Sequence, residues 1–132
     1  MNYKKRHNYL VFQVAKPMLE KAGYSVYCVK SKVVKTKQGW RNKGEDIFGA
    51  DIIAVGKNDV KFIQVTTNKD LKKRVKKFNC YNFPVNETCK VEVWLARKIK
   101  GNWEFKEGLY NKAKQKIIFK KDLTNKVKSS II

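Results

Sequence analysis

The sequence predicts an α/β (α+β) domain in which a mixed central sheet is flanked by helices. Three features predict it: apolar residues at helical spacing near the N-terminus, a strand-turn-strand signal at 46–67, and further strands after a second helical segment. With 132 residues and 42% hydrophobic residues, the chain can build one compact core rather than two. The predicted order is helix, strand, strand, strand, helix, strand, strand.

The first helix is expected from about Arg6 to Ala22, where apolar side chains recur every three or four residues. Pro17 lies inside this pattern and is expected to kink the helix or to start a new first turn. Gln13 and Glu20 are seven residues apart and share a face. Either one is a candidate auxiliary site residue, although for each taken alone a solvated outer face is the favoured interpretation.

A strand is expected over Tyr24 to Lys30, with Val33-Val34 as a candidate extension. The segment from Lys35 to Glu45 is predicted to be a loop. It contains Trp40, Arg41 and Lys43 between glycines, a composition suited to contacts with phosphates and to stacking on a base. An ordinary surface loop with Trp40 at the edge of the core is the alternative.

The clearest signal is a hairpin from Asp46 to Thr67, in which two β-branched runs flank Gly56-Lys57-Asn58-Asp59. If Val55 pairs with Val60, antiparallel counting places Asp51 opposite Gln64. Opposed residues share a face with Cβ atoms roughly 5 Å apart. Thr66 lies on that face too, because side chains alternate along a strand.

This hairpin therefore gathers a carboxylate, an amide carbonyl and a hydroxyl at one place. These oxygen ligands suit Mg²⁺ (or Mn²⁺), which usually takes one or two carboxylates and completes its shell with water and phosphate oxygens. Asp46 is an auxiliary ligand or, equally, a residue that forms the preceding turn.

A second helix is predicted from Lys69 to about Phe78, with Asn68 as its N-cap and Leu71, Val75 and Phe78 as its apolar stripe. The rest of its surface is cationic and predicts an anion-binding face. The candidate nucleic-acid-binding residues there are Lys69, Lys72, Lys73, Arg74, Lys76 and Lys77.

Strands are expected at Lys90 to Arg97, at Trp103 to Lys106 after a Gly101-Asn102 turn, and at Ile117 to Phe119. The apolar content of the first of these strands predicts a central position in the sheet. We therefore assign residues 1–132 to one domain, with its core at about 8–106 and a Lys-rich C-terminal extension at 109–132.

The formal net charge of +20 favours an anionic partner. Nucleic acid is the common one, with DNA favoured over RNA here, and an anionic membrane surface is the alternative. No apolar run reaches the length of a membrane span, so no spanning segment is expected, and nucleic acid rather than a membrane is assigned as the partner. Cys28, Cys80 and Cys89 lack metal-site spacing and predict reduced thiols in a cytoplasmic protein.

The predicted order, with Gly49-Ala50-Asp51-Ile52-Ile53-Ala54 on one strand and Phe62-Ile63-Gln64-Val65-Thr66 on the next, resembles the PD-(D/E)xK nuclease superfamily. This restriction-endonuclease-like group includes archaeal Holliday junction resolvases and nucleases of phages and mobile elements. The resemblance covers about Asn8 to Arg97. It implies a helix-strand-strand-strand-helix-strand core and Mg²⁺-dependent hydrolysis of DNA, with metal held by Asp51, the Gln64 side-chain oxygen and the Val65 carbonyl.

Two positions depart from the family's pattern. Gln64 stands where Glu is usual, and its amide carbonyl can still bind metal. Thr66 stands where a catalytic Lys is usual, and a neutral hydroxyl cannot stabilise developing negative charge in the same way. Lys30, Lys32, Lys69 and Lys73 are candidate replacements for that cation.

Three functions follow as hypotheses. The first is a divalent-metal-dependent DNA endonuclease with Asp51, Gln64 and Thr66 as catalytic residues, acting on DNA that includes branched or junction forms. The second is a catalytically inactive nucleic-acid-binding module of the same fold. The third, based on charge alone, is an RNA-binding or ribosome-associated protein. A homodimer is suggested by analogy with resolvases.

Overall fold

A computed structural model describes residues 3–29, 32–43, 47–84 and 86–119 of the chain. Its helical elements are α1 (Tyr3–Tyr9), the π-helical segment η1 (Leu10–Ala15), α2 (Lys16–Lys21) and α3 (Lys72–Asn79). Its strands are β1 (Ser25–Cys28), β2 (Lys32–Thr36), β3 (Gly39–Lys43), β4 (Ile52–Val55), β5 (Val60–Thr66), β6 (Cys89–Ile99), β7 (Asn102–Asn111) and β8 (Lys116–Phe119).

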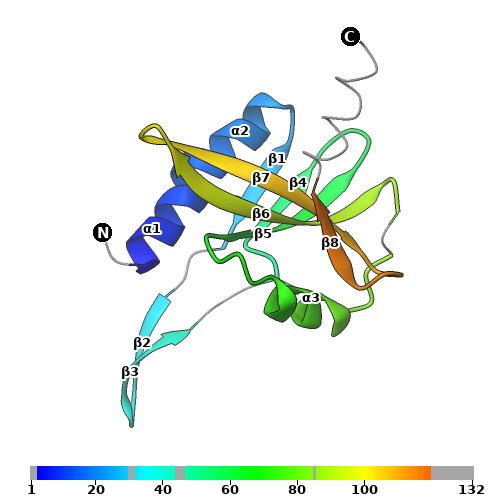
Figure 1. Ribbon diagram of the computed structural model, residues 1–132. Coiled ribbons are helices and arrows are strands. Elements are labelled where there is room, and N and C mark those ends of the chain that lie inside the picture. Colours follow the sequence, from blue (N-terminus) through cyan, green and yellow to red (C-terminus); the bar gives the residue numbers. More distant parts are fainter. Residues whose placement is uncertain (1–2, 30–31, 44–46, 85, 120–132) are drawn as a thin grey trace.

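Within the described ranges, the main sheet has six strands in the order β1-β4-β5-β6-β7-β8. All neighbouring strands are antiparallel except β5 and β6. These two run parallel because the connection through α3 returns the chain to the edge of the sheet at which β5 begins (Figure 1). Parallel neighbours require such a crossover. The predicted α+β class, with a mixed sheet, is confirmed.

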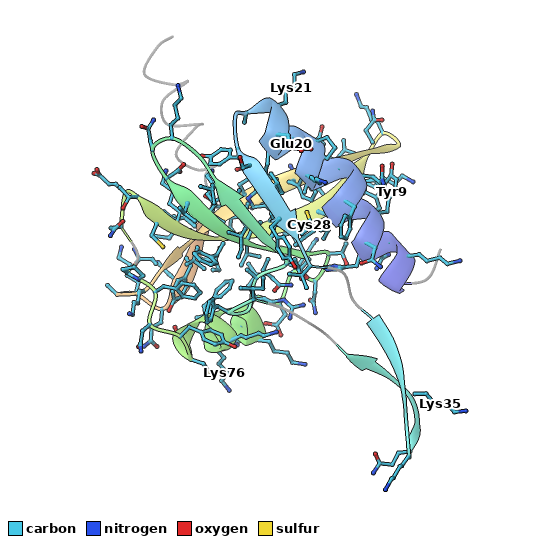
Figure 2. All side chains as sticks on the ribbon, turned by 180° about the vertical axis from the view of Figure 1, so that it is seen from behind. Tyr9, Glu20, Lys21, Cys28, Lys35 and Lys76 are labelled. Carbon is cyan, nitrogen blue, oxygen red and sulfur yellow. The ribbon has the colours of Figure 1, made fainter. Side chains whose placement is uncertain are left out.

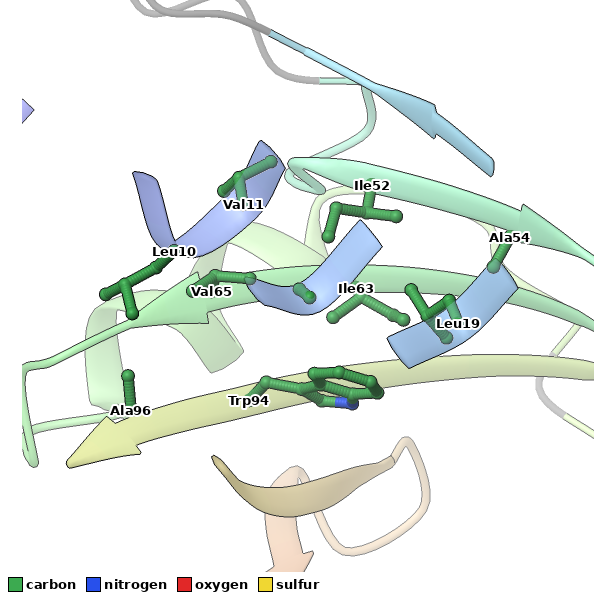
Figure 3. Packing of buried hydrophobic residues seen from close by; sticks show 10 residues of the cluster. Leu10, Val11, Leu19, Ile52, Ala54, Ile63, Val65, Trp94 and Ala96 are labelled. Atoms are coloured by element: carbon green, nitrogen blue, oxygen red, sulfur yellow. The ribbon is translucent and has the colours of Figure 1, made fainter. Parts of the chain in front are cut away.

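Helices cover both faces of this sheet. The helical segment α1-η1-α2 buries Leu10, Val11, Ala15 and Leu19 against one face, as the close view in Figure 3 shows. On the other face α3 contributes Phe78 to a second cluster, which also includes side chains of β6 and β7. Adjacent residues of one strand contribute to the two clusters on opposite faces of the sheet, because side chains alternate along a strand.

Pro17 lies in the first turn of α2, as one of the two predicted alternatives has it, and the chain runs into α2 from η1 without leaving the helical backbone region. The helix continues through it because the preceding segment widens to a π-helix, in which the N–H of Lys16 bonds to the carbonyl of Val11. A proline has no N–H and its ring clashes with the carbonyl four residues earlier. A π-helical turn relieves both problems without breaking the helix.

The predicted hairpin register is confirmed: Val55 pairs with Val60 and Ile52 with Ile63. At the turn, Asp59 accepts a hydrogen bond from the Tyr24 hydroxyl at 2.7 Å and pairs with the Lys90 ammonium at 3.1 Å. Burial alone would raise the pKa of Asp59, but these two partners outweigh it and lower the pKa below its ordinary value. The turn is thereby fixed to the end of the N-terminal helix and the start of β6.

The predicted loop from Lys35 to Glu45 is wrong over its described part. Residues 32–43 form a two-stranded hairpin, β2 with β3, that stands away from the main sheet (Figure 1). Val33, Val34 and Trp40 favour extended backbone, and Gly39 closes the turn with a φ of +108°. The surrounding lysines and glycines concealed this signal in the sequence.

The predicted start of the second helix is also wrong, because α3 begins at Lys72 and Asn68 does not cap it. The Asn68 side chain instead accepts the N–H of Asp70 at 2.9 Å, and the Asp70 side chain accepts the N–H of Lys72 at 3.2 Å. Such local bonds compete with the first helical turn and delay it.

The strand around Lys90 to Arg97 lies inside the sheet between β5 and β7, as expected. The next strand, β7, runs to Asn111 rather than ending at Lys106, and β8 pairs with it. The sheet therefore continues into the segment assigned to the C-terminal extension. No helix in the described ranges has the length and apolar character to cross a membrane.

One ion pair is buried under the N-terminal helix. Lys61 on β5 lies 3.2 Å from the Glu92 carboxylate on β6, whose other oxygen accepts the indole N–H of Trp94 at 2.9 Å. Glu92 is fully buried and Lys61 is 7% exposed. Each charge depends on its partner, since an isolated charge at such a position is costly.

We predict that Glu92→Ala lowers the free energy of unfolding by about 3 to 5 kcal/mol, because it leaves the Lys61 ammonium buried and unpaired. Urea unfolding followed by circular dichroism measures the change. The double variant Lys61→Met, Glu92→Leu should recover most of the loss, since it removes both charges. A cost for Glu92→Ala within about 1 kcal/mol would contradict this role.

Candidate functional site

The candidate site is built around Asp51, which directly precedes β4. Its backbone is held on both sides: its N–H donates to the Ile63 carbonyl and its carbonyl accepts the Val29 N–H, each at 2.8 Å. The preceding turn closes with reciprocal hydrogen bonds between Ile47 and Ala50. The position of the carboxylate is therefore fixed by the sheet rather than by a free loop.

The Asp51 carboxylate contacts the end of β5. Its Oδ2 atom accepts the Gln64 side-chain N–H at 2.8 Å and the Val65 backbone N–H at 2.9 Å. Asp51 is 8% exposed and Gln64 is 7% exposed. The two side chains predicted to lie together do so, and each retains a small opening to solvent.

The same atoms allow a test of whether this site fits a divalent cation. The Gln64 amide nitrogen lies 2.8 Å from Asp51 Oδ2 and 3.4 Å from the Val65 carbonyl oxygen. An NH₂ group thus faces two oxygens of the predicted metal ligands. Reversing the amide would bring its own oxygen to the same place, giving three oxygen donors that suit Mg²⁺ or Mn²⁺. The set fits a weak, hydrated ion, and no cluster of three His, Cys, Asp or Glu occurs among the described residues.

Thr66 is placed on this part of β5 but is only 2% exposed. Its hydroxyl accepts the Asn68 N–H at 3.1 Å, so it shapes the turn that leaves the strand. This contact gives Thr66 a structural role, and its predicted catalytic role stays a prediction.

Sequence reasoning missed two residues of α1. His7 Nε2 lies 3.4 Å from Asp51 Oδ2, an ion pair when the imidazole is protonated. The neighbouring Arg6 guanidinium reaches the Thr67 hydroxyl at 3.5 Å. A usable signal existed: His7 precedes the buried Leu10 and Val11 by three and four residues and so shares their side of the helix.

The structure does not bring Gln13 or Glu20 to the site. Both are exposed, and among the described contacts neither reaches Asp51 or Gln64. Figure 2 shows Glu20 on the outer side of α2. The helix turns its apolar side toward the sheet, so His7 near the end of α1 reaches the carboxylate, while Gln13 and Glu20 are exposed.

Other predicted site residues lie elsewhere. Trp40, Arg41 and Lys43 belong to β3 of the projecting hairpin, and Asp46 lies outside the described residues. Of the candidate replacements for the missing lysine, Lys30 is also outside them, Lys32 begins β2, and Lys69 and Lys73 are exposed.

The predicted cationic surface is present along α3 and the turn before it. Its lysines are largely exposed, as Figure 2 shows for Lys76, while Leu71, Val75 and Phe78 pack toward the sheet. The charged residues of this surface are Lys69, Lys72, Lys73, Arg74, Lys76 and Lys77.

Cys28 is the thiol nearest to this region in the sheet, since it pairs with Ile52 beside Asp51. Burial raises the pKa of the Cys28 thiol; nearby Lys16 opposes the rise, while Glu20 and Asp51 add to it. The neutral thiol is therefore favoured, and it is a poor metal ligand or nucleophile.

The chain matches no protein-family profile, no curated protein and no solved structure.

We predict that Gln64→Glu makes folding stability depend on metal. Without metal the variant should lose about 1 to 3 kcal/mol, because a carboxylate replaces the hydrogen bond to Asp51 with repulsion. Mn²⁺ should then raise its melting temperature more than that of the wild-type protein, since a second carboxylate strengthens the ligand set. Thermal unfolding with and without Mn²⁺ measures both effects, and Gln38→Glu on the exposed β2-β3 turn is the matched control. An equal response to Mn²⁺ in both variants would argue against a cation at this place.

Proposed function

We propose that the protein is a divalent-metal-dependent endonuclease that hydrolyses phosphodiester bonds in DNA. The observation that carries the proposal is the convergence of the Asp51 carboxylate, the Gln64 amide and the Val65 carbonyl at the end of β5. Oxygen donors of this kind, partly open to solvent, are suited to a hydrated Mg²⁺ that also binds a phosphate.

The order of elements supports the finer assignment to a restriction-endonuclease-like core. An N-terminal helix is followed by three antiparallel strands, a crossover helix and a parallel strand, in the sequence α1-η1-α2, β1, β4, β5, α3, β6. The β2-β3 hairpin is an insertion in this order. The acidic residue precedes the second of these strands, and the amide lies near the end of the third, as the resemblance implies.

Two surfaces support binding of a polyanion. The lysines of α3 begin at Lys72, after the segment that leaves β5. The β2-β3 hairpin carries a further set of cationic residues, and its sequence from 32 to 43 contains no acidic residue. Lys35, on the projecting hairpin, is exposed (Figure 2). A two-stranded ribbon of this kind has the dimensions to enter the major groove of a duplex.

In this proposal, different residues of the chain have different roles. Asp51, Gln64 and Val65 would hold the cation, and α3 would hold the phosphate backbone. When bound, the metal supplies a polarised phosphoryl oxygen and a more acidic water. Arg6 would supply the positive charge that the missing strand lysine would otherwise provide, because its guanidinium lies beside Thr67 and is always protonated.

We predict that Asp51→Asn abolishes plasmid nicking in Mn²⁺ while leaving the protein folded. The asparagine oxygen can still accept the Val65 N–H, but the site loses its anionic ligand. Gel analysis of supercoiled, branched and single-stranded DNA measures cleavage, with Glu104→Gln on the exposed edge of β7 as the charge-matched control. Equal cleavage by Asp51→Asn and wild type would refute the assignment.

We predict that Arg6→Ala lowers the rate of cleavage by about 100-fold, the usual cost of removing one group that stabilises developing charge. Arg6→Lys should retain part of the rate, because the charge remains. The melting temperatures of both variants are measured beside the rates. A rate loss that follows the melting temperature in both variants would show a structural role instead.

A second candidate function is a nucleic-acid-binding module without cleavage. It is favoured by the Gln64 amide, whose nitrogen rather than oxygen faces Asp51, and by the burial of the Thr66 hydroxyl. A module of this kind would bind DNA with strong salt dependence in chelator and in Mn²⁺ alike. It would also fail to nick any substrate, so the two functions separate in one pair of assays.

A further inference from the structure

A second site lies on the face of the sheet that α3 covers. It is a pocket of about 620 Å³, within the range of small-ligand pockets. Its walls are mainly aromatic and aliphatic, and among the residues that the structure describes no Lys, Arg, Asp or Glu lines it. The lining residues that matter below are Phe48, Phe62, Tyr81, Asn82, Phe83 and Thr88.

The aromatic rings meet at steep angles. Phe48 lies 5.4 Å from Tyr81 at 75° and 6.4 Å from Phe83 at 87°, measured between ring centroids. None of the described ring pairs at this pocket is stacked face to face. A flat ligand can therefore stack on a ring without displacing an existing stack.

Phe48 is held in an unusual way. Its φ of +52° lies in the left-handed region, where a bulky side chain costs energy, and its side chain is 53% exposed. The turn continues through Gly49, where an added Cβ would lie 3.3 Å from the Phe78 ring. The chain thus places a large aromatic residue at the mouth of the pocket, packed edge-on against Tyr81 and Phe83 and still half exposed to solvent.

The pocket and the candidate site share one face of the sheet. Phe62 in the pocket and Gln64 in the site are two residues apart on β5, so their side chains project from the same face about 7 Å apart. Phe48 precedes Asp51 by three residues. One nucleotide, or two adjacent nucleotides, can therefore contact the pocket and the candidate site together.

The chemistry of the pocket selects among flat ligands. Asn82 is exposed and has no hydrogen-bond partner among the described residues, so its amide is available to the edge of a base. Lys77 does not line the pocket, and its side-chain Cγ lies beside Gly49, the residue after Phe48. A largely aromatic interior without charged side chains among the described residues suits a base whose phosphates remain outside.

We infer that this pocket binds one unpaired nucleobase of the DNA substrate, stacked on Phe48 and read by Asn82. The inference rests on the proposed function for the identity of the ligand as a nucleic acid. It adds that the preferred substrate has a base free of its partner, as at a bulge, a mismatch or a branch point. A base within a paired duplex would first have to leave the stack.

The test compares two duplexes of the same sequence, one with a single bulged adenine and one with an abasic residue at the same bulge. Binding is measured by fluorescence anisotropy in EDTA, so that cleavage plays no part. The wild-type protein should bind the adenine bulge about tenfold more tightly, the scale of one base stacked on an aromatic side chain.

Phe48→Ala should abolish this preference and leave the affinity for the abasic duplex unchanged. Tyr27→Ala is the matched control, because Tyr27 on β1 is also aromatic and is 62% exposed, and this variant should keep the preference. Asn82→Ala provides a second variant that leaves the rings in place and should reduce the preference.

Equal binding of the two duplexes by the wild-type protein would overturn the inference, as would a parallel loss of affinity for both duplexes in Phe48→Ala. A protein that fails to nick DNA in Mn²⁺ but keeps the tenfold preference would refute the nuclease and uphold the pocket. A protein that binds neither duplex would refute both.

Discussion

The structure depends on the way a largely buried carboxylate is satisfied at the end of β5. Asp51 is only 8% exposed, so the cost of its burial must be met by hydrogen bonds, and the Val65 N–H and the Gln64 amide provide them. These bonds tie the start of β4 to the end of β5, and His7 adds α1. One charged group thereby links the β4-β5 hairpin to a helix that is distant from it in sequence.

This carboxylate lies where the sheet changes from antiparallel to parallel pairing. β5 pairs with β4 on one side and with β6 on the other, and the chain leaves β5 through a turn that leads into α3. The cationic helix therefore starts near the same end of the sheet. This is why we connect the charge of the chain with this site.

Gln64 and Thr66 are neutral at positions where the resemblance implies charged residues. We propose that the missing positive charge is supplied from a different element. Arg6 brings a positive charge from α1 to the end of the strand, and His7 Nε2 lies 3.4 Å from Asp51 Oδ2. The aromatic pocket adds a second recognition element on the same face, so that stacking contributes to selection of the substrate beside charge. Stacking weakens less with salt than phosphate contacts do, which lets the two contributions be measured separately.

The sequence alone was enough to predict the α+β class, the register of the β4-β5 hairpin and the meeting of Asp51 with Gln64. These depend on alternation and turn chemistry, which act between residues close in the chain. It did not determine the β2-β3 hairpin, where lysines and glycines masked a weak extended signal, or the start of α3, where Asn68 and Asp70 form local turns. Only the tertiary structure placed His7 and Arg6 at the site and Phe48 at its pocket. Contacts between a helix and strands some 45 to 60 residues away depend on how the apolar faces pack, and packing leaves no local pattern in the sequence.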